Sequence, residues 1–418
     1  MRITLLALGS RGDVQPFVPL GKALRERGHR VRVASFETFE PLFAKAGLDF
    51  HPIAGDAQAL VSAAGDGMLT GGRNPLTAFL ALRRSFAALA DGIGHDLADP
   101  SLADTELILN QLPGNLYGSD LAERLGIRSL SLGVLPLTQT KAWPMMAFPS
   151  APARLPGYNL LSYRLAEGLL WQLFGAAIQR WRTTRLGLRR LPGSTPWFHN
   201  RQEPVIYGFS EHVVPRPVDW GSEVAITGWW LPQWPGYQPP DPLRRFVEAG
   251  DPPVYIGFGS MPVRDSAGLT RTVVEGVRLA GVRAVLNAGW AGLGGRLPPE
   301  ILGIAETPFD WLFPRVAAVV HHGGSGTVGF GLTRGRPTQI VPFGFDQFFW
   351  GERIRALGIG PAPLPIHRLN ASRLADSLVR VTRYHRLRER AEILGAQLHA
   401  EDGPATAAER IEALASVG

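Results

Sequence analysis

The stretch from Val316 to Gln347 constrains the fold more than any other part of the chain. Its first residues, Val316 to Val320, form a short apolar run rich in β-branched side chains, which is typical of a parallel strand buried on both faces. The run ends at His321 and His322, and a glycine turn leads into an apolar segment that opens with Thr327. Unpaired N–H groups and the positive end of a helix dipole favour phosphate oxygens at such a turn. We therefore expect a phosphate ester to bind here.

A second apolar run, Thr338 to Val341, predicts the neighbouring strand and leads through Pro342 to Asp346 and Gln347. Ligands of open α/β sheets lie just past the carboxyl ends of the strands. A carboxylate and an amide at that place suit a group rich in hydroxyls. The alternative for both residues is a helix cap.

The order of these residues resembles a known signature. His321-His322-Gly323-Gly324-Ser325-Gly326-Thr327, followed by Pro342 and Asp346-Gln347, is similar to the donor-sugar motif of the nucleotide-sugar-dependent glycosyltransferases of family one. Within that family the likeness is strongest to the sterol glucosyltransferases and to bacterial enzymes that glycosylate natural products. The resemblance implies an α/β protein of the GT-B fold, in which two Rossmann-like, doubly wound domains face each other across a cleft and the C-terminal domain binds the donor.

The resemblance also implies roles for individual residues. His322 corresponds to the histidine that contacts the diphosphate, although a histidine at a strand end is often only structural. The role of His321 stays open. Asp346 and Gln347 correspond to the residues that hydrogen-bond the sugar. Further donor contacts are implied at Ser260, Trp311, Gly324, Ser325, Gly326 and Thr327. The base-stacking tryptophan of the family does not align cleanly with Trp311, so uridine and thymidine nucleotides both remain open.

The N-terminus predicts a βαβ unit with a strand at Ile3 to Leu8 and a helix from Pro16 to Arg27. A dinucleotide-binding fold is the alternative, but the intervening turn has two glycines where that fingerprint needs three. The turn instead resembles the Gly-Ser-Arg-Gly-Asp-Val-Gln-Pro opening of the sterol glucosyltransferases, matched from Gly9 to Pro16. That resemblance implies that Asp13 is the general base, and the alternative for Asp13 is a helix N-cap.

The rest of the chain continues the alternation of strands and helices. The patterns predict strands at 107–110, 129–132, 205–209, 224–227, 253–258 and 283–287, and helices at 75–97, 120–125, 267–279 and 372–417. The segment from Leu137 to Leu155 breaks this alternation. It carries the apolar side chains Trp143, Met145, Met146 and Phe148 among prolines, and with the amphipathic stretch Tyr158 to Trp181 it is our candidate for the acceptor wall. A lid over the core is the alternative.

Length and composition indicate two domains. A chain of 418 residues is too long for one compact core. The five prolines between Leu231 and Pro242 predict a stiff linker. We expect an N-terminal acceptor domain at 1–235, a C-terminal nucleotide-sugar domain at 243–400, and a final helix at 401–418 that crosses back to the first domain.

Charge and cysteine usage narrow the classes of ligand. The net charge of +7 comes almost wholly from scattered arginines, a distribution that argues against nucleic acid and suits an anionic donor or an anionic membrane surface. The chain has no cysteine, and its histidines and carboxylates lack metal-ligand spacing. We expect no metal and no cofactor besides the co-substrate. The apolar segments are too short or too often interrupted for a signal peptide or a membrane span, so we expect a cytoplasmic protein that is compatible with peripheral membrane contact. The sequence does not reveal the oligomeric state.

These features together predict an inverting transferase that moves glucose or a related hexose from a UDP-sugar to a hydroxyl of a lipophilic acceptor, such as a sterol or a natural-product aglycone, and so gives a β-glycoside. The alternatives are a dTDP-sugar-dependent antibiotic glycosyltransferase, an epimerase or hydrolase of a nucleotide sugar on the same fold, and a binding protein without catalysis.

Overall fold

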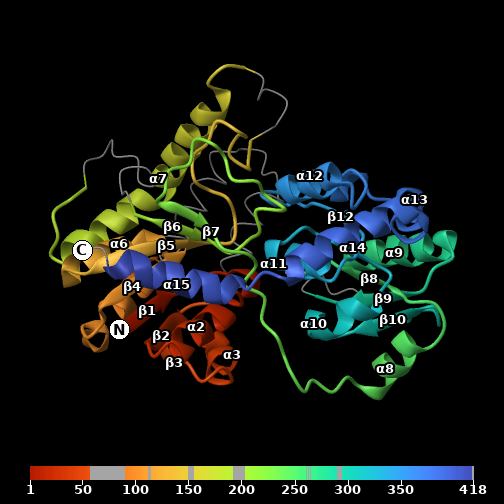
Figure 1. Ribbon diagram of the computed structural model, residues 1–418, viewed down its shortest axis with the longest axis horizontal. Helices are drawn as coiled ribbons and strands as arrows, with labels where there is room; N and C mark the ends of the chain where they lie inside the picture. Colours follow the sequence, from red (N-terminus) through yellow and green to blue (C-terminus); the bar gives the residue numbers. More distant parts are fainter. Residues whose placement is uncertain are drawn as a thin grey trace. The chain divides into compact units, whose positions relative to one another are not determined.

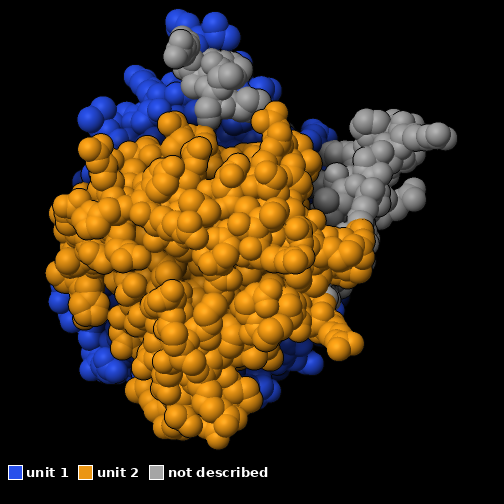
Figure 2. Space-filling model, turned by 90° about the vertical axis from the view of Figure 1, so that its right-hand side faces the viewer, with its two compact units in different colours: residues 1–209, 216–230, 403–418 blue, residues 210–215, 231–402 orange. Residues whose placement is uncertain are grey.

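The chain folds into two compact α/β units. The computed structural model describes residues 1–56, 90–111, 114–148, 155–191, 203–259, 261, 263, 265–289 and 294–416. Unit 1 comprises 1–209, 216–230 and 403–418, and unit 2 comprises 210–215 and 231–402 (Figure 2). Each unit has its own parallel sheet, as the fold prediction requires.

The sheet of unit 1 has seven parallel strands in the order β3-β2-β1-β4-β5-β6-β7 (Figure 1). The strands are β1 (Arg2–Leu6), β2 (Arg30–Phe36), β3 (Asp49–Ile53), β4 (Leu107–Gln111), β5 (Arg128–Gly133), β6 (Val205–Tyr207) and β7 (Val224–Ile226). The sequence patterns missed β3, because its Pro52 and charged flanks hide the strand signal.

Alternate residues of β1 and of the turn after it face two separate cores. Ile3, Leu5 and Ala7 belong to the core shared with α2 (Phe17–Glu26) and α15 (Gly403–Ser416). Leu6 and Leu8 belong to the core shared with α6 (Asn115–Leu125) and α7 (Tyr158–Thr184). A strand with apolar neighbours on both faces reads as an unbroken apolar run, which is why β1 was visible in the sequence. Two short helices, α1 (Arg11–Val14) and α3 (Glu40–Ala44), complete this half with a helical segment at 90–97. The remainder of the helix predicted at 75–97 lies outside the described residues.

The last helix, α15, packs in unit 1. Its Ala407, Ala408 and Ile411 are buried in the core beside α2. Glu412 accepts hydrogen bonds from Arg27 at 2.6 Å and from His29 at 2.8 Å, and these bonds lower the pKa of the Glu412 carboxyl to about 2. The end of the chain is therefore fixed to its beginning.

The sheet of unit 2 has five parallel strands in the order β10-β9-β8-β11-β12. They are β8 (Val254–Gly257), β9 (Ala284–Asn287), β10 (Ile301–Ile304), β11 (Ala318–His321) and β12 (Thr338–Ile340). The helices are α8 (Asp241–Glu248), α9 (Ser266–Ala280), α10 (Phe309–Leu312), α11 (Ser325–Thr333), α12 (Gln347–Leu357), α13 (Ala371–Arg383) and α14 (His385–His399). The sequence patterns missed β10, whose four residues include a glycine.

The unit boundaries differ from those that the sequence predicted. The segment 210–215 clusters with unit 2, where Ser210 Oγ donates to Glu401 at 2.6 Å and Arg353 Nε donates to the Val213 carbonyl at 2.8 Å. The start of the proline-rich linker also belongs to unit 2, since the Trp234 N–H donates to Asp310 at 2.8 Å. Side-chain contacts between distant segments set these boundaries.

Strand order reverses once in each sheet, between β1 and β4 in unit 1 and between β8 and β11 in unit 2. Helical connections leave such neighbouring strands in opposite directions, so a crevice opens at their carboxyl ends, where open α/β sheets bind ligands. The loops after these four strands are therefore the first places to look for function. None of the described helices is both long and apolar enough to cross a bilayer.

Candidate functional site

The turn after β11 in unit 2 is built for close approach of a ligand to backbone. Gly323 has a φ of 103° and packs so tightly that a Cβ there would lie 2.9 Å from Ile340 and 3.1 Å from Gln347. Gly324 follows as the N-cap of α11, and Ser325, Gly326 and Thr327 form the first turn of that helix. The N–H groups of a first helical turn have no intrahelical partner and carry the positive end of the dipole. The glycine turn and the helix start expected from the sequence are therefore both present, and anion binding at this place stays a prediction.

His322 lies between two glycines beside this helix start. A Cβ on Gly259 would lie 2.7 Å from His322 Cε1, and a Cβ on Gly324 would lie 2.5 Å from His322 Nε2. The ring therefore occupies space that is open only because Gly259, after β8, and Gly324, the N-cap of α11, have no side chains. Its Nε2 is the atom nearest the Gly324 position. Burial lowers the pKa of His322 to about 4, so the ring is neutral at pH 7 and has one N–H group with which it can donate a hydrogen bond.

The low pKa of His322 predicts an acid-sensitive fold. An unfolded histidine takes up a proton near pH 6.5, whereas folded His322 does so near pH 4. Stability is therefore unaffected above pH 6.5 and falls as the pH drops through this window, by up to about 3 kcal/mol. We expect urea unfolding at pH 5 and pH 7.5 to show a smaller difference for His322→Gln than for the wild type. An identical pH dependence in both proteins would contradict the assignment.

His321 has a different task. Its side chain is fully buried, and its Nδ1 accepts the Gly323 N–H at 3.1 Å. Burial is the main cause, and neighbouring His322 a lesser one, of a pKa well below the usual value. His321 therefore stays neutral and fixes the glycine turn from beneath. The sequence left its role open because this bond depends on how the turn folds back.

Asp346 and Gln347 begin α12, on the loop after β12. Asp346 occupies the N-cap position, but its side chain makes no capping hydrogen bond. Gln347 is buried, and its Oε1 accepts the N–H groups of Phe343 at 2.7 Å and Gly344 at 3.3 Å. Its oxygen therefore supports the loop, and its Nε2 lies 3.1 Å from the Met261 sulfur. A sugar contact by Gln347 would have to come from this amide nitrogen.

The same loop contains Phe345, the non-glycine residue with positive φ among those described, at 52°. The left-handed conformation is costly for an aromatic residue and is found most often near ligand sites. Phe345 is also exposed. Such a conformation persists only when contacts of the neighbouring residues enforce it, so the loop after β12 has a fixed backbone geometry.

Two further residues that the resemblance assigned to the donor site are Trp311 and Ser260. Trp311 lies in α10, where the Arg315 guanidinium covers its ring at 4.5 Å and Tyr237 meets it edge-on at 5.9 Å. One face of the indole is thus already covered by a cation. Ser260 lies outside the described residues.

In unit 1, Asp13 lies in the short helix α1, which follows β1 at the switch point of the sheet. Its Oδ2 accepts the Ser10 N–H at 2.8 Å and the Ser10 hydroxyl at 2.7 Å. Gly9 permits this curl, because a Cβ there would lie 2.7 Å from the same oxygen. Among the described residues no hydrogen bond engages Oδ1. Asp13 thus closes a capping box on α1 with Oδ2, and its Oδ1 can accept a hydrogen bond or a proton from another group.

The environment of Asp13 suits a base. Burial raises the pKa of the Asp13 carboxyl above its ordinary value, and the two Ser10 hydrogen bonds oppose that rise. A higher pKa makes the carboxylate a stronger proton acceptor. The N-cap alternative for Asp13 is wrong, because Ser10 is the N-cap of α1 and Asp13 is the N3 residue of the same capping box. This N3 role uses Oδ2 and leaves Oδ1 for the proposed base.

Gln111 supports this loop, and sequence reasoning missed it. Its Nε2 donates to the Asp13 carbonyl at 2.9 Å and to the Leu8 carbonyl at 3.2 Å. Gln111 is the last residue of β4, the strand across the switch point from β1. The signal that could have revealed Gln111 is its amide side chain at the end of the predicted strand 107–110, where ligands of open α/β sheets bind.

The candidate acceptor residues Trp143, Met145, Met146 and Phe148 are all half-buried in a segment without regular structure. The Met145 N–H donates to Ser162 Oγ of α7 at 2.8 Å, and the Trp143 ring meets Trp220 edge-on at 6.2 Å. These contacts fix the segment to α7 and to the end of the sheet. Residues 149–154, the end of the predicted acceptor segment apart from Leu155, lie outside the described residues.

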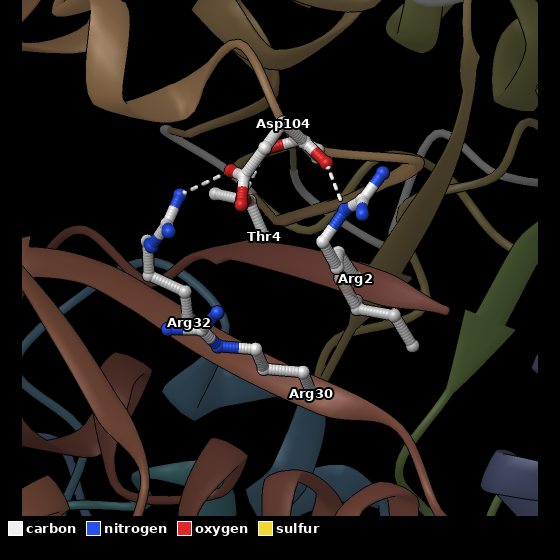
Figure 3. A pocket seen from close by; sticks show the side chains of 7 residues that line it. Arg2, Thr4, Arg30, Arg32 and Asp104 are labelled. Carbon is white, nitrogen blue, oxygen red and sulfur yellow. Dashed lines mark hydrogen bonds and ion pairs between the residues drawn. The ribbon is translucent and has the colours of Figure 1, made fainter.

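A small cavity at the opposite edge of the unit 1 sheet can be set aside. It measures about 10 Å³, room for about one water, and Arg2, Thr4, Arg30, Arg32 and Asp104 line it (Figure 3). Arg2 Nε donates to the Asp104 carbonyl at 2.6 Å and Arg32 donates to its carboxylate at 2.9 Å. The cavity lies at the amino ends of β1 and β2, so its ion pairs serve the fold. Among the described residues no group of three or more histidines and carboxylates could hold a metal ion.

Comparison with known proteins finds glycosyltransferase domains in both halves of the chain. The N-terminal domain of glycosyltransferase family 28 matches residues 3–93, and the C-terminal domain of erythromycin biosynthesis protein CIII-like proteins matches residues 280–414. Sterol 3-beta-glucosyltransferases of Neosartorya fischeri and Pichia angusta are each 38% identical to the chain over 98% of its length. The chain spans about a third of the length of these curated relatives, since the matches cover 29% and 33% of them.

Solved structures show the same fold. The glycotransferase of kitacinnamycin superposes with a TM-score of 0.72 at 21% identity, covering 99% of this chain and 98% of the other. The glycosyltransferase VinC in complex with dTDP superposes with a TM-score of 0.66 at 19% identity, covering all of both chains. With its two parallel-sheet units and its matches at both ends, the chain belongs to the family-1 glycosyltransferases of GT-B fold, in the group that is similar to sterol glucosyltransferases and bacterial natural-product glycosyltransferases.

Proposed function

We propose that the protein transfers a hexose, glucose or a close relative, from a UDP-sugar to a hydroxyl of a lipophilic acceptor with inversion at the anomeric carbon. The observation that supports the proposal is the α11 start, where glycine backbone and the neutral His322 ring lie side by side. The sterol glucosyltransferase relatives favour a sterol-like acceptor.

The reaction needs an anchor for the leaving group. In the proposal the diphosphate oxygens accept hydrogen bonds from the N–H groups of the first α11 turn and from the His322 ring. Hydroxyl and backbone donors of Ser325, Gly326 and Thr327 complete the set. As the bond between the sugar and the diphosphate breaks, its electron pair stays on the diphosphate, and preorganised donors stabilise that charge. Asp346 and the Gln347 amide nitrogen orient the sugar.

The reaction also needs a proton acceptor. The acceptor oxygen attacks the anomeric carbon from the face opposite the diphosphate, and its proton passes to Asp13 Oδ1. The Ser10 bonds hold the carboxylate by its other oxygen. Inversion of an α-linked donor gives a β-glycoside.

Turnover of UDP-glucose against a panel of sterols, macrolides and flavonoids tests the function. We expect a β-glucoside of at least one lipophilic acceptor, and the same assay with dTDP-glucose compares the nucleotides. Release of free glucose or an epimerised donor, with no transfer to any acceptor, would indicate hydrolase or epimerase chemistry instead. Metal-independent transfer stays a prediction, and EDTA added to this assay checks it.

A thermal shift assay separates a binding protein from an enzyme. Any ligand that binds only the folded state raises the unfolding temperature. A shift with UDP-glucose but no turnover would favour a non-catalytic role. The absence of any shift would remove the donor assignment.

A further inference from the structure

The first half of α7 presents an apolar row to solvent. Leu161, Leu165 and Leu169 recur at a spacing of four, so they lie along one face of the helix. They are 50%, 54% and 54% exposed. A Cβ on Gly168, between the last two, would meet nothing within 4 Å. This face, which we call the leucine row, is open.

The opposite face of α7 is packed. Tyr163 and Ala166 are buried, and Ser162 Oγ accepts the Met145 N–H at 2.8 Å. The helix is therefore apolar on both faces, although the protein covers only one of them. A contiguous exposed apolar surface of this kind marks an interaction site.

The exposed charge beside the leucine row on α7 is positive. Glu167, the acidic residue of α7, is 5% exposed and faces the protein. Arg164 is exposed beside Leu161 and Leu165, and within the described parts of the chain no carboxylate pairs with it. The whole chain carries a net charge of +7. An apolar row that has an exposed cation and no exposed acid on its own helix complements an anionic lipid surface, into which a helix sinks its apolar face while arginine stays at the headgroups.

We propose that α7 docks in the plane of an anionic lipid bilayer through Leu161, Leu165, Leu169 and Arg164. The docking does not depend on the reaction. The advantage of docking for catalysis does rest on the proposed function. The segment 141–148 is fixed to the other side of α7 by the Met145 N–H, which donates to Ser162, and by Asn159 Nδ2, which donates to the Lys141 carbonyl at 2.7 Å. Docking would hold the candidate acceptor residues within one helix diameter, ~10 Å, of the lipid in which a lipophilic acceptor is dissolved.

Sedimentation of the full chain with vesicles tests the proposal. The vesicles are phosphatidylcholine alone, or phosphatidylcholine mixed with phosphatidylglycerol. We expect binding to the mixed vesicles, and a loss on the order of a hundred-fold in Leu161→Ser/Leu165→Ser/Leu169→Ser. Arg164→Gln should weaken binding to the mixed vesicles about fivefold and leave binding to neutral vesicles unchanged.

The matched control is Leu279→Ser/Ile393→Ser. These two side chains are 57% and 59% exposed on helices of unit 2, and their loss should leave vesicle binding unchanged. Equal binding by the triple variant and the wild type, or no binding by the wild type, would overturn the proposal. A wild-type dimer that the triple substitution dissociates, without vesicle binding, would assign the leucine row to a second copy of the chain.

Two acceptor preparations distinguish this inference from the proposed function. In the triple variant, turnover with acceptor embedded in mixed vesicles should fall much further than turnover with the same acceptor dispersed in detergent micelles. If the wild type transfers no sugar in micelles, the proposed function fails while the vesicle-binding result still stands.

Discussion

Asp13→Asn is expected to lower turnover by about 10²–10⁴-fold while UDP-sugar affinity stays unchanged. The amide has the shape of the carboxylate, and its oxygen can keep the bonds from the Ser10 N–H and hydroxyl. It cannot take a proton from the acceptor hydroxyl. Turnover measured with saturating donor, together with calorimetric titration of UDP, gives both quantities.

Ser10→Ala is the matched control for Asp13→Asn. It removes one hydrogen bond to Oδ2 but leaves the carboxylate, so the loss of turnover should be much smaller. Since the Ser10 bonds lower the pKa of Asp13, the acidic limb of the pH–rate profile should move upward in this variant. Wild-type turnover in Asp13→Asn, or an unmoved profile in Ser10→Ala, would remove Asp13 as the base.

Gly324→Ala is expected to weaken UDP binding by about 10–100-fold, the range for loss of a hydrogen bond to a charged group. The new Cβ would lie 2.5 Å from His322 Nε2, so the ring must leave its place beside the α11 start. The methyl group would also lie in the path by which the diphosphate reaches the backbone N–H groups of the first α11 turn. Calorimetric titration of UDP measures the effect.

Gly331→Ala, on the same helix, controls for a general effect of adding a methyl group. Its Cβ would meet Thr338 Oγ1 at 3.3 Å, far from the helix start, and donor affinity should stay within about twofold of the wild type. If both variants bind UDP as the wild type does, the phosphates bind elsewhere. If both lose binding equally, the effect comes from the stability of unit 2.

Local patterns in the chain reveal much of this architecture. The apolar runs at β1, β8 and β11 are visible because strands covered on both faces exclude polar residues. The glycine turn after β11 is visible because a positive φ and close packing need glycine at fixed positions. Short strands such as β3 and β10 lack such constraints and were missed.

The sequence by itself therefore determined the two α/β domains and the glycine turn before α11, and its resemblance to a known family indicated the candidate residues Asp13 and His322. Only the tertiary structure decided that Ser10 donates both hydrogen bonds to the same oxygen of Asp13. It also decided that Gln111 donates to the Asp13 carbonyl, and that burial keeps His322 neutral. The physical reason is the range of the interactions. Backbone preferences and burial patterns act over a few residues and leave a record in the order of amino acids. Hydrogen bonds and desolvation at a site instead depend on segments that are distant in the chain and meet only after folding.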